Sequence, residues 1–395
     1  MNGLDGWLDG ARVLHLFANY KWTGPADPAI RTAARLRARG LDVVWALAGF
    51  VHPGGEHRMA EELARWRVPV VTGLELRKHF HLRSLAADVA ALRAILRRDR
   101  IDLVHCHLPN DHLIAALARR RLSRPPVVVR TLYDAEPPPR GLRTRFAFAR
   151  TAGVLAPTPA VARAFAARFA MPADRVLVQE PVTEPRARAG DTLRARWGLG
   201  PQHRVVAITA RIQPHRRFDL LWDTAAHVCR ALPDARFVLL GRGNAEDTQR
   251  LVHAPVAARA LAPHVVLPGY LKEPDYSAAL RSCDAFLFLV PGSDGTCRAV
   301  REAMAFGLPV VSTRRGMLPE IVAPPGRPAA GFATDERADA LGDALLRLLR
   351  DDAQRPQVAA AALQRALTDM DPARAAQELH RFYGRLLAAR AGVRA

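Results

Sequence analysis

The sequence predicts an α/β fold of two doubly wound, parallel-sheet domains, and three observations support this prediction. The chain has 395 residues, which is more than a single core usually supports. Short apolar runs alternate with helical patterns, as expected of βαβ units. This alternation begins a second time at Arg204, after the proline-rich segment Glu180–Arg188. We therefore expect an N-terminal domain of residues 1–186 and a C-terminal domain of residues 187–371, with a cleft between them.

The composition is that of an ordinary globular protein, with 49% apolar and 6% aromatic residues. Met1–Ala18 lacks the basic and apolar regions of a signal peptide, and no window of 18 residues is apolar throughout. The four cysteines are scattered without a CxxC pair, which is typical of a reducing compartment. These features together predict a cytoplasmic protein.

The net charge of +20 favours anionic partners, namely phosphates, acidic membrane surfaces or nucleic acid. Only three of the 58 basic residues are lysines, so part of this charge reflects a general bias toward arginine. Few aromatic residues and the lack of a recognition-helix, RNP or zinc pattern argue against a nucleic-acid module. The basic segments Arg77–Arg100 and Arg140–Arg150 are interpreted either as solvated faces or as a contact with an anionic membrane.

The first domain begins with a βαβ unit. Ala11–Ala18 and Asp42–Ala48 are predicted strands, and Ala29–Arg39 is the helix between them. The turn Asn19–Pro28 follows the first strand, where ligands bind in such folds, but it lacks the GxGxxG dinucleotide fingerprint. The further strands expected in this domain are Val68–Thr72, Ile101–Leu108, Val127–Leu132, Val154–Ala156 and Val176–Gln179. The further helices are expected at Met59–Trp66, Leu74–Arg100, Gly141–Ala149 and Pro159–Phe169.

A group of histidines and a cysteine ends the strand Ile101–Leu108. His105, Cys106, His107 and His112 together suggest a metal site. However, Cys106 points to the opposite face of the strand, and no further ligand at the usual spacing completes the set. We therefore expect no metal here, and instead predict that His107 is a polar site residue at the carboxyl end of a parallel strand.

The second domain repeats the pattern and contains the most informative stretch, Gly292–Val322. Its strands are expected at Arg204–Ala210, Arg236–Leu240, Val265–Leu267, Ala285–Val290 and Leu308–Thr313. Its helices are expected at Phe218–Leu232, Thr248–Leu261, Pro274–Arg281, Cys297–Phe306, Asp335–Leu349 and Arg355–Leu367, followed by the terminal helix Pro372–Ala391. Thr296 is the expected N-cap of the helix Cys297–Phe306, and Gly307 its stop. A glycine-containing loop before a helix N-terminus favours phosphate binding, which assigns the loop around Asp294, Gly295 and Thr296 to a ligand.

Charged residues follow the strands of this second series. Arg211 and Arg216 lie after the strand Arg204–Ala210, where two guanidinium groups can grip a diphosphate, and Gly241 opens the glycine-rich loop GRGNAED. The alternative is that both arginines are ordinary surface residues. Glu302 is either a ligand-binding carboxylate or a solvated partner of Arg298 at i−4.

The stretch SDGTCRAVREAMAFGLPVVSTRRGMLPEIV, preceded by Arg211 and Arg216, resembles the C-terminal half of GT-B glycosyltransferases of family 4, the retaining, metal-independent group. The resemblance is strong over residues 203–325 and weaker over residues 11–180. It implies two Rossmann-like domains facing a central cleft, with the acceptor bound by the first domain and the donor by the second. It also implies that the helix 372–391 crosses back to the first domain.

The resemblance assigns roles residue by residue. Arg211 and Arg216 would grip the phosphates, Glu302 the nucleotide ribose and Asp294 the donor sugar. The remaining positions are the phosphate-contacting backbone at Gly295 and Thr296, the active-site histidine His107, and the first-domain loop containing Thr23 and Gly24. The sequence departs from the family pattern at Asp294 and Arg216, where glutamate and lysine are usual, and at Thr296-Cys297.

The function implied is transfer of a hexosyl group from a UDP-, GDP- or ADP-sugar to a glycan or lipid-linked acceptor, with retention of configuration and no metal or other cofactor. The motif Asp369-Met370-Asp371 matches DxD, but its place before Pro372 predicts a helix stop and an N-cap instead. A nucleotide-sugar epimerase or a phosphorylase on the same fold remains the alternative. Because of the basic segments, we also expect peripheral contact with the inner face of an anionic membrane.

Overall fold

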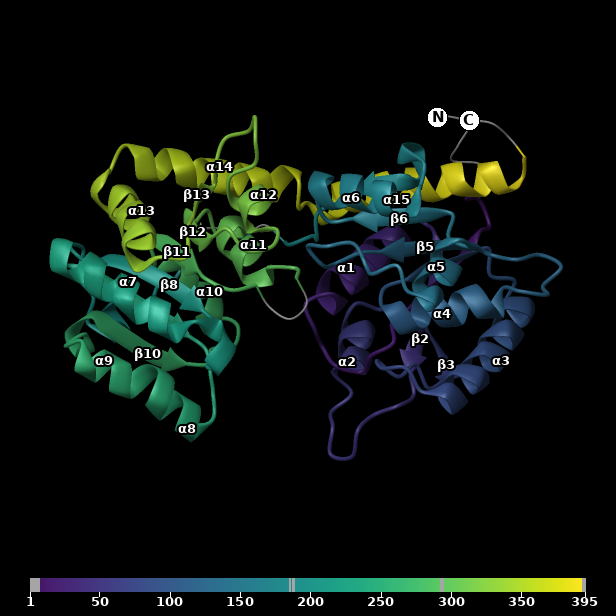
Figure 1. Cartoon of the computed structure of the whole chain (residues 1–395), viewed down its shortest axis with the longest axis horizontal. Coiled ribbons are helices and arrows are strands. Elements are labelled where there is room, and N and C mark those ends of the chain that lie inside the picture. Colours follow the sequence, from purple (N-terminus) through teal and green to yellow (C-terminus); the bar gives the residue numbers. More distant parts are fainter. Residues whose placement is uncertain (1–7, 185, 187–188, 292–294, 393–395) are drawn as a thin grey trace. The chain divides into compact units, whose positions relative to one another are not determined.

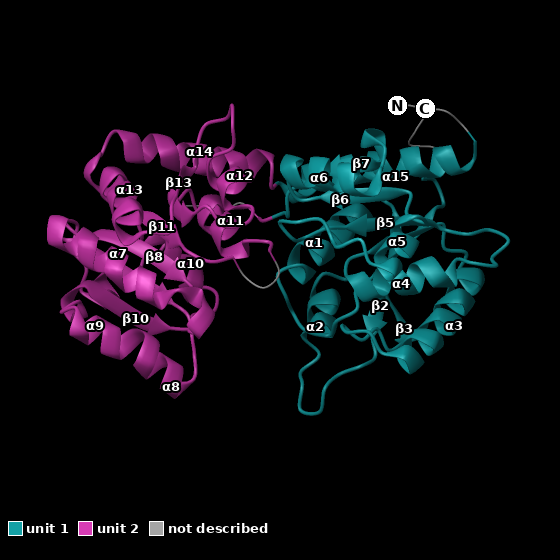
Figure 2. Cartoon of the chain, viewed as in Figure 1, with its two compact units in different colours: residues 1–182, 371–395 teal, residues 183–370 magenta. Residues whose placement is uncertain are grey.

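The chain divides into two units, residues 1–182 with 371–395 and residues 183–370 (Figure 2). The computed structural model describes residues 8–184, 186, 189–291 and 295–392. Each unit contains one parallel sheet with helices packed against it (Figure 1). The change of unit at residue 182 is close to the expected boundary at 186, and the C-terminal helix belongs to the first unit.

The first unit has a seven-stranded sheet in the order β3-β2-β1-β4-β5-β6-β7. All neighbouring strands pair in parallel. The order reverses between β1 and β4, so the crevice above this point is where such folds bind ligands. The strands are β1 (Arg12–Leu16), β2 (Asp42–Ala48), β3 (Val70–Leu74), β4 (Leu103–Cys106), β5 (Val127–Thr131), β6 (Gly153–Ala156) and β7 (Val176–Val178).

The helices of the first unit cover this sheet. They are α1 (Ala26–Ala38), α2 (Arg58–Arg65), α3 (Leu82–Arg98), α4 (Pro109–Ala118), α5 (Leu142–Phe148), α6 (Pro159–Phe169), the short 3₁₀ turn Ala173–Arg175, and α15 (Pro372–Arg390). The last helix packs on α1, and its Phe382 and Tyr383 are buried with Val13 and Ile30 in one core. Burial of this apolar face holds the C-terminus of the chain on the first unit.

The second unit has a six-stranded parallel sheet in the order β10-β9-β8-β11-β12-β13. Its order reverses between β8 and β11, which gives the second unit its own switch point. The strands are β8 (Arg204–Thr209), β9 (Ala235–Leu240), β10 (Val265–Gly269), β11 (Ala285–Phe288), β12 (Val310–Thr313) and β13 (Gly331–Thr334).

The helices of the second unit connect these strands. They are α7 (Phe218–Ala231), α8 (Ala245–Thr248), α9 (Ala254–Ala258), α10 (Asp275–Arg281), α11 (Arg298–Ala305), α12 (Leu318–Val322), α13 (Ala338–Arg350) and α14 (Gln354–Thr368), with 3₁₀ turns at Ala195–Trp197, Pro214–Arg216 and Ala262–His264. As predicted, Gly307 ends α11: its φ is +66°, and its N–H bonds to the carbonyl of Met304. Pro309 then leads into β12.

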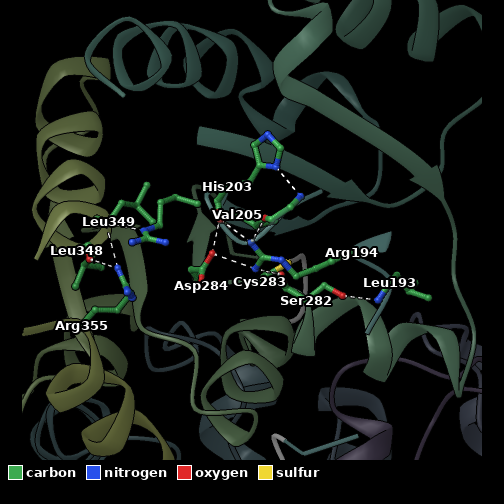
Figure 3. A network of polar contacts seen from close by, with 12 residues as sticks. Leu193, Arg194, His203, Val205, Ser282, Cys283, Asp284, Leu348, Leu349 and Arg355 are labelled. Carbon is green, nitrogen blue, oxygen red and sulfur yellow. Dashed lines mark hydrogen bonds and ion pairs between the residues drawn. The ribbon is translucent and has the colours of Figure 1, made fainter. Parts of the chain in front are cut away.

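A polar network ties the first segment of the second unit to its sheet (Figure 3). Arg194 donates to the carbonyl oxygens of Ser282 and His203, at 3.1 and 2.5 Å. It also pairs with Asp284, whose other contact is the backbone N–H of Val205 at 2.8 Å. Because Val205 lies at the start of β8 and Asp284 just before β11, this network joins the amino ends of the two strands, opposite the carboxyl edge at which ligands bind.

Two expected helices differ from the structure, and a third helix was not expected. The helix predicted over 74–100 begins only at Leu82, because the backbone N–H groups of Glu75 and Leu76 bond instead to the buried carboxylate of Asp88. The helix predicted over 248–261 is divided by a π-helical segment, Gln249–His253. Helix α4 was not predicted at all, because nearly all its residues are buried and it shows no amphipathic period.

Candidate active site

The loops that follow β8, β9 and β10 are joined through their backbones at the carboxyl edge of the second sheet. Ala210 N–H donates to Leu240 O at 3.2 Å, and Ile212 N–H donates to Arg242 O at 3.0 Å. The N–H of Gly241 donates to Gly269 O at 3.1 Å. These bonds extend the sheet beyond its strands and fix the backbone from which Arg211 projects.

Glycine is required in the loop after β9 for a packing reason. A Cβ atom at Gly241 would lie 1.8 Å from the carbonyl oxygen of Ala210, and one at Gly243 would lie 2.7 Å from Cβ of Ile212. Neither position can hold a side chain without moving the neighbouring loop. The glycine-rich pattern is therefore explained by close backbone approach, and the donor contact assigned to Gly241 remains a prediction.

The two arginines of the predicted phosphate grip both lie at this edge. Arg216 ends the 3₁₀ turn before α7 and is half-buried, and its Nη1 donates to the carbonyl oxygens of Val290 and Pro291 at 3.2 and 3.3 Å. This places its guanidinium group next to the segment that follows β11. Arg211 is exposed. The Arg216 side chain thus lies at the carboxyl edge between β8 and β11, where the fold favours ligand binding, and the phosphate contact of Arg211 remains a prediction.

The loop before α11 differs from the prediction in its cap. Asp294 lies outside the described residues. Thr296 was expected to be the N-cap, but Cys297 occupies that position with a left-handed φ of 51°, and its own side chain does not cap the helix. Thr296 is buried instead, and its carbonyl oxygen accepts a hydrogen bond from Nε of Arg301 at 3.0 Å. Gly295, with φ of +66°, allows the turn that brings the chain to this geometry.

Glu302 projects from α11 with both carboxylate oxygens engaged. Oε1 lies 3.3 Å from Nε of Arg298, the i−4 partner that the sequence suggested. Oε2 accepts a hydrogen bond of 2.9 Å from the hydroxyl of Tyr276 on α10. The side chain retains 26% exposure, so the carboxylate is oriented and yet remains accessible to a ligand.

Tyr276 was missed by the sequence analysis. Burial, with the negative charge of Glu302, raises the pKa of Tyr276 well above its usual value, so the phenol stays protonated and donates to the carboxylate. The signal in the sequence is weak, since a tyrosine in the second position of a short helix has many uses. Only the folded arrangement of α10 beside α11 identifies it as a positioning residue.

In the first unit, the loop containing Thr23 and Gly24 lies between β1 and α1. The carbonyl oxygen of Thr23 accepts bonds from the N–H groups of Ala26 and Asp27, at 3.1 and 3.4 Å. Helix α1 therefore starts at Ala26, three residues before the predicted position of 29. Gly24 is buried. The loop lies at the carboxyl edge of the first sheet, next to its switch point.

His107 follows β4 and is buried, with both ring nitrogens engaged. Nδ1 is hydrogen-bonded to the hydroxyl of Tyr133 at 2.7 Å, and Nε2 to Nδ1 of His15 at 3.0 Å. Burial lowers the pKa of His107 well below its usual value, so the imidazole is neutral. His107 also lines a small cavity of about 30 Å³ in the first unit.

The suspected metal cluster is arranged differently from the expectation. Cys106 does point to the opposite face, where it joins an apolar core, and His112 turns away to bond Thr151 at 2.7 Å. The third histidine beside His105 and His107 is His15, which lies directly across from His105 in the parallel register of β1 and β4. The sequence analysis considered only neighbours in sequence and therefore missed it.

The DxD motif has the structural role that was predicted. Asp371 is the N-cap of α15 and accepts from the N–H of Arg374 at 2.7 Å. Asp369 forms ion pairs with Arg327 and Arg365, at 2.7 and 3.2 Å. Both carboxylates are thus used within the fold.

The class of protein follows from the two sheets and the family matches. Two Rossmann-like units, each a parallel sheet with one switch point, support a GT-B fold. Residues 29–181 match the model described as Glycosyltransferase Family 4, and residues 203–351 match the model described as Glycosyl transferases group 1. These two matches, one in each unit, support a GT-B glycosyltransferase of family 4.

Curated relatives resemble only part of the chain. A D-inositol 3-phosphate glycosyltransferase of Segniliparus rotundus is 32% identical over 140 residues, 34% of this chain and 31% of the relative. A GDP-mannose-dependent monoacylated alpha-(1-6)-phosphatidylinositol monomannoside mannosyltransferase of Corynebacterium glutamicum is 28% identical over 177 residues, 42% of this chain and 44% of the relative. The matches span less than half of the length of these curated relatives.

Solved structures resemble nearly the whole chain in fold. Anabaena HepE in complex with UDP has a TM-score of 0.75 at 20% identity, covering 93% of this chain and 98% of HepE. A glycosyltransferase from Rickettsia africae has a TM-score of 0.75 at 13% identity, covering 95% and 98%. At these identities the similarity concerns the fold alone. Among the described residues, no helix has the length and apolar character needed to cross a membrane.

Proposed function

We propose that the chain transfers a hexosyl group from a nucleotide-diphosphate sugar to an acceptor hydroxyl, with retention of configuration and without a metal ion on the diphosphate. The observation that carries the proposal is the switch point of the second sheet. There, Arg216 is held against the segment after β11, and Glu302 is oriented by Tyr276. This arrangement presents cationic donors for phosphates and a fixed carboxylate for hydroxyl groups at one edge.

The donor would bind entirely to groups of the second unit. Arg211 and Arg216 grip the diphosphate and stabilise the negative charge that develops on it as the sugar departs. Backbone groups at Gly241, Gly295 and Thr296 contact the phosphates, and Glu302 binds the ribose hydroxyls. Asp294 binds the donor sugar. Because the arginines supply the positive charge, the leaving diphosphate needs no Mg²⁺ or Mn²⁺.

The acceptor would bind to the first unit, at the loop with Thr23 and Gly24 and beside His107. The buried, neutral imidazole of His107 has both nitrogens bonded to protein groups, so its contribution is to shape the wall of the site. Relatives named as phosphatidylinositol mannosyltransferases support a lipid-linked or cell-envelope glycan as the acceptor. GDP-mannose in the name of one relative and UDP bound to HepE support two different donor nucleotides.

A surface of the first unit supports contact with an anionic membrane. Leu142 on α5 is 85% exposed and Leu82 on α3 is 70% exposed, while Phe80 lies beneath the guanidinium group of Arg143 at 3.5 Å. Exposed leucines among arginines are typical of interfacial helices. We expect the protein to sediment with anionic vesicles at low salt, and Leu142→Glu to weaken this. Failure to sediment would contradict the membrane contact and leave the transferase proposal intact.

The experiment that tests the proposed function measures nucleotide binding by thermal shift and calorimetry. The panel consists of UDP, GDP, ADP and their sugars, applied to the wild type, to Glu302→Ala and to the exposed-surface control Glu246→Ala. Ligand at about 100 times Kd stabilises a protein by roughly 2.7 kcal/mol, which such a measurement detects. One nucleotide should stabilise the wild type and the control but not Glu302→Ala. No stabilisation by any nucleotide would overturn the proposal.

The alternative function on the same fold is a nucleotide-sugar epimerase or a phosphorylase. It would also bind a nucleotide or a sugar phosphate, so binding alone does not separate the two. Analysis of products does: an epimerase interconverts donors without an acceptor, whereas a transferase releases nucleoside diphosphate only as acceptor is consumed. A nucleic-acid-binding role would instead appear as steeply salt-dependent binding without turnover.

A further inference from the structure

The switch point of the first sheet contains a group of three buried histidines. His15 comes from β1, His105 from β4 and His107 from the residue just after β4. One ring nitrogen from each lies within 4.8 Å of the others, and Nδ1 of His15 is 3.0 Å from Nε2 of His107. In a tetrahedral zinc site, nitrogens at about 2.0–2.1 Å from the ion lie roughly 3.3 Å apart, so only small movements are needed.

We propose that His15, His105 and His107 bind a first-row transition-metal ion, with Zn²⁺ as the best fit, and that an oxygen ligand completes the site. The proposal concerns the first unit alone and does not depend on the proposed transferase function. The proposed ion also differs from the divalent metal of DxD enzymes, because it would not bind a diphosphate. The chemistry of the ligands selects the ion: three imidazoles suit Zn²⁺, Co²⁺, Ni²⁺ or Cu²⁺, and not Mg²⁺ or Ca²⁺.

The protonation state of the three rings suits a metal. All three imidazoles are buried, and burial favours the neutral form of the ring, in which one nitrogen has a lone pair that an ion can take in place of a hydrogen bond. The nearby cation is buried Arg130, whose guanidinium group donates to the carbonyl oxygen of Thr131. A metal ion would therefore bind to neutral ligands.

Hydroxyl groups outside the cluster orient two of the rings. Nδ1 of His107 is bonded to the Tyr133 hydroxyl at 2.7 Å, and Nδ1 of His105 to the Tyr383 hydroxyl at 2.5 Å. Burial raises the pKa of both tyrosines, so each stays protonated. A partner on one ring nitrogen directs the other toward the metal, which is the usual outer support of a metal-bound histidine.

The third ring provides an independent sign that the cluster is incomplete as a hydrogen-bond network. Nε2 of His15 has no hydrogen-bond partner among the residues that the structure describes, although the side chain is fully buried. A buried polar atom without a partner has an energetic cost and requires an explanation. An ion bound by Nε2 of His15 would supply one, whereas an ion bound by Nδ1 would leave this atom without a partner.

Space and an oxygen ligand are also present. All three histidines line the cavity of about 30 Å³, a volume above the 10–15 Å³ or so that one water requires. Thr131 lines it as well, with its Oγ1 2.6 Å from Nε2 of His105. The threonine hydroxyl or a water can take the fourth position. A bound ion would join β1 to β4 directly and, through Tyr383, would couple both strands to α15.

The test measures metal bound to the full-length chain without an affinity tag. After incubation with Zn²⁺ and dialysis against metal-free buffer, the wild type should retain about one ion per chain by elemental analysis. His15→Phe preserves the ring that stacks on Trp45 and should retain less than about a tenth of it. The matched control, His112→Gln, removes a buried imidazole outside the cluster and should retain the ion.

A second measurement does not depend on any variant folding correctly. Wild-type protein titrated with Co²⁺ should develop the visible absorption bands of a tetrahedral nitrogen and oxygen site, saturating at about one equivalent. Tyr383→Phe should weaken the affinity roughly tenfold or more while leaving the spectrum similar. Absence of the bands in the wild type, or retention of zinc by a folded His15→Phe/His105→Phe double variant, would overturn the proposal.

Discussion

The two units place very different chemistry at the same point of the same architecture. At the switch point of the first sheet, neutral histidines and tyrosines are buried and bonded to one another. At that of the second sheet, Arg216 and Glu302 remain partly exposed, Arg216 bonded to backbone carbonyl groups and Glu302 to Arg298 and Tyr276. The comparison shows that the topology determines where a site lies, and the residues after the strands determine what it can bind.

The energetic consequence of this difference is that the two edges respond to different perturbations. The charged, accessible groups of the second unit interact mainly with a charged ligand, so substitutions among them should affect binding and turnover more than folding. Buried neutral groups contribute to the fold itself, so changes there should affect stability and its dependence on pH. The four predictions below test this division, from the largest expected effect to the smallest.

Removal of the Arg216 side chain should have the largest effect. Arg216→Ala should lower kcat for sugar transfer by about 10²–10³-fold, because one preorganised charge on the leaving diphosphate is lost. Arg216→Lys, which retains the charge but not the planar geometry, should lose much less. The control Arg230→Ala on α7 should have wild-type activity in the same assay. Equal activity of Arg216→Ala and the control would contradict the proposal that Arg216 stabilises the leaving diphosphate.

A methyl group at Gly241 should damage the second edge through its backbone. Its Cβ would lie 1.8 Å from the carbonyl oxygen of Ala210, so the loops after β8 and β9 must separate. We expect Gly241→Ala to lower the free energy of unfolding by at least about 2 kcal/mol, measured by denaturant titration. Gly141→Ala is the control, because a Cβ there meets nothing within 4 Å. A neutral Gly241→Ala would show that the loops adapt.

Features that depend on neighbouring residues could be predicted from the sequence. Gly307 and Pro309 specify the end of α11 within a few positions, and Asp371 before Pro372 specifies the start of α15. The alternation of strands and helices likewise determines the parallel sheets. In each case the physical cause, a left-handed cap or a missing N–H, acts over a few residues.

Features that depend on residues distant in sequence could not be predicted in the same way. His15 and His107 are 92 positions apart and meet only through the register of β1 and β4. Tyr276 is 26 positions from Glu302, and nothing local marks its hydroxyl as a partner. The prediction of Thr296 as the N-cap was wrong for a different reason: a non-glycine residue with φ of 51°, such as the observed N-cap Cys297, is uncommon, so sequence preference favours Thr296.

Acid should destabilise the first unit through buried histidines outside the cluster. Burial and Arg130 lower the pKa of His112, which bonds Thr151 on its Nε2. The unfolded chain binds a proton below about pH 6.5 and the folded one does not, so this stability is complete above that pH and is lost as the pH falls.

The variant His112→Gln isolates that contribution. Between about pH 6.5 and about pH 5.5 the wild type should lose roughly 1 kcal/mol more of its free energy of unfolding than the variant does. Other groups titrate in both proteins and cancel in this difference. Thr151→Val, which removes the partner but not the titrating ring, should be destabilised about equally at both pH values. A variant as acid-sensitive as the wild type would show that His112 is protonated without unfolding.

The smallest effect expected is that of the Tyr276 hydroxyl on the orientation of Glu302. Tyr276→Phe removes one hydrogen bond of 2.9 Å and should weaken nucleotide binding about fivefold, corresponding to roughly 1 kcal/mol. Because the Arg298 pair and the carboxylate remain, KM for the donor should rise while kcat changes little.

The neighbouring hydroxyl on α10 provides the control that separates positioning from packing. The hydroxyl of Ser277 donates to Glu273 at 2.6 Å, so Ser277→Ala should leave KM for the donor unchanged. If Tyr276→Phe and Ser277→Ala lower the thermal stability equally and neither alters KM, the tyrosine only packs α10 against α11. If KM rises in Tyr276→Phe alone, the buried, neutral hydroxyl of Tyr276 helps to orient Glu302 for the donor. The second unit then also depends on a buried neutral group, and it differs from the first unit only in how many such groups it uses.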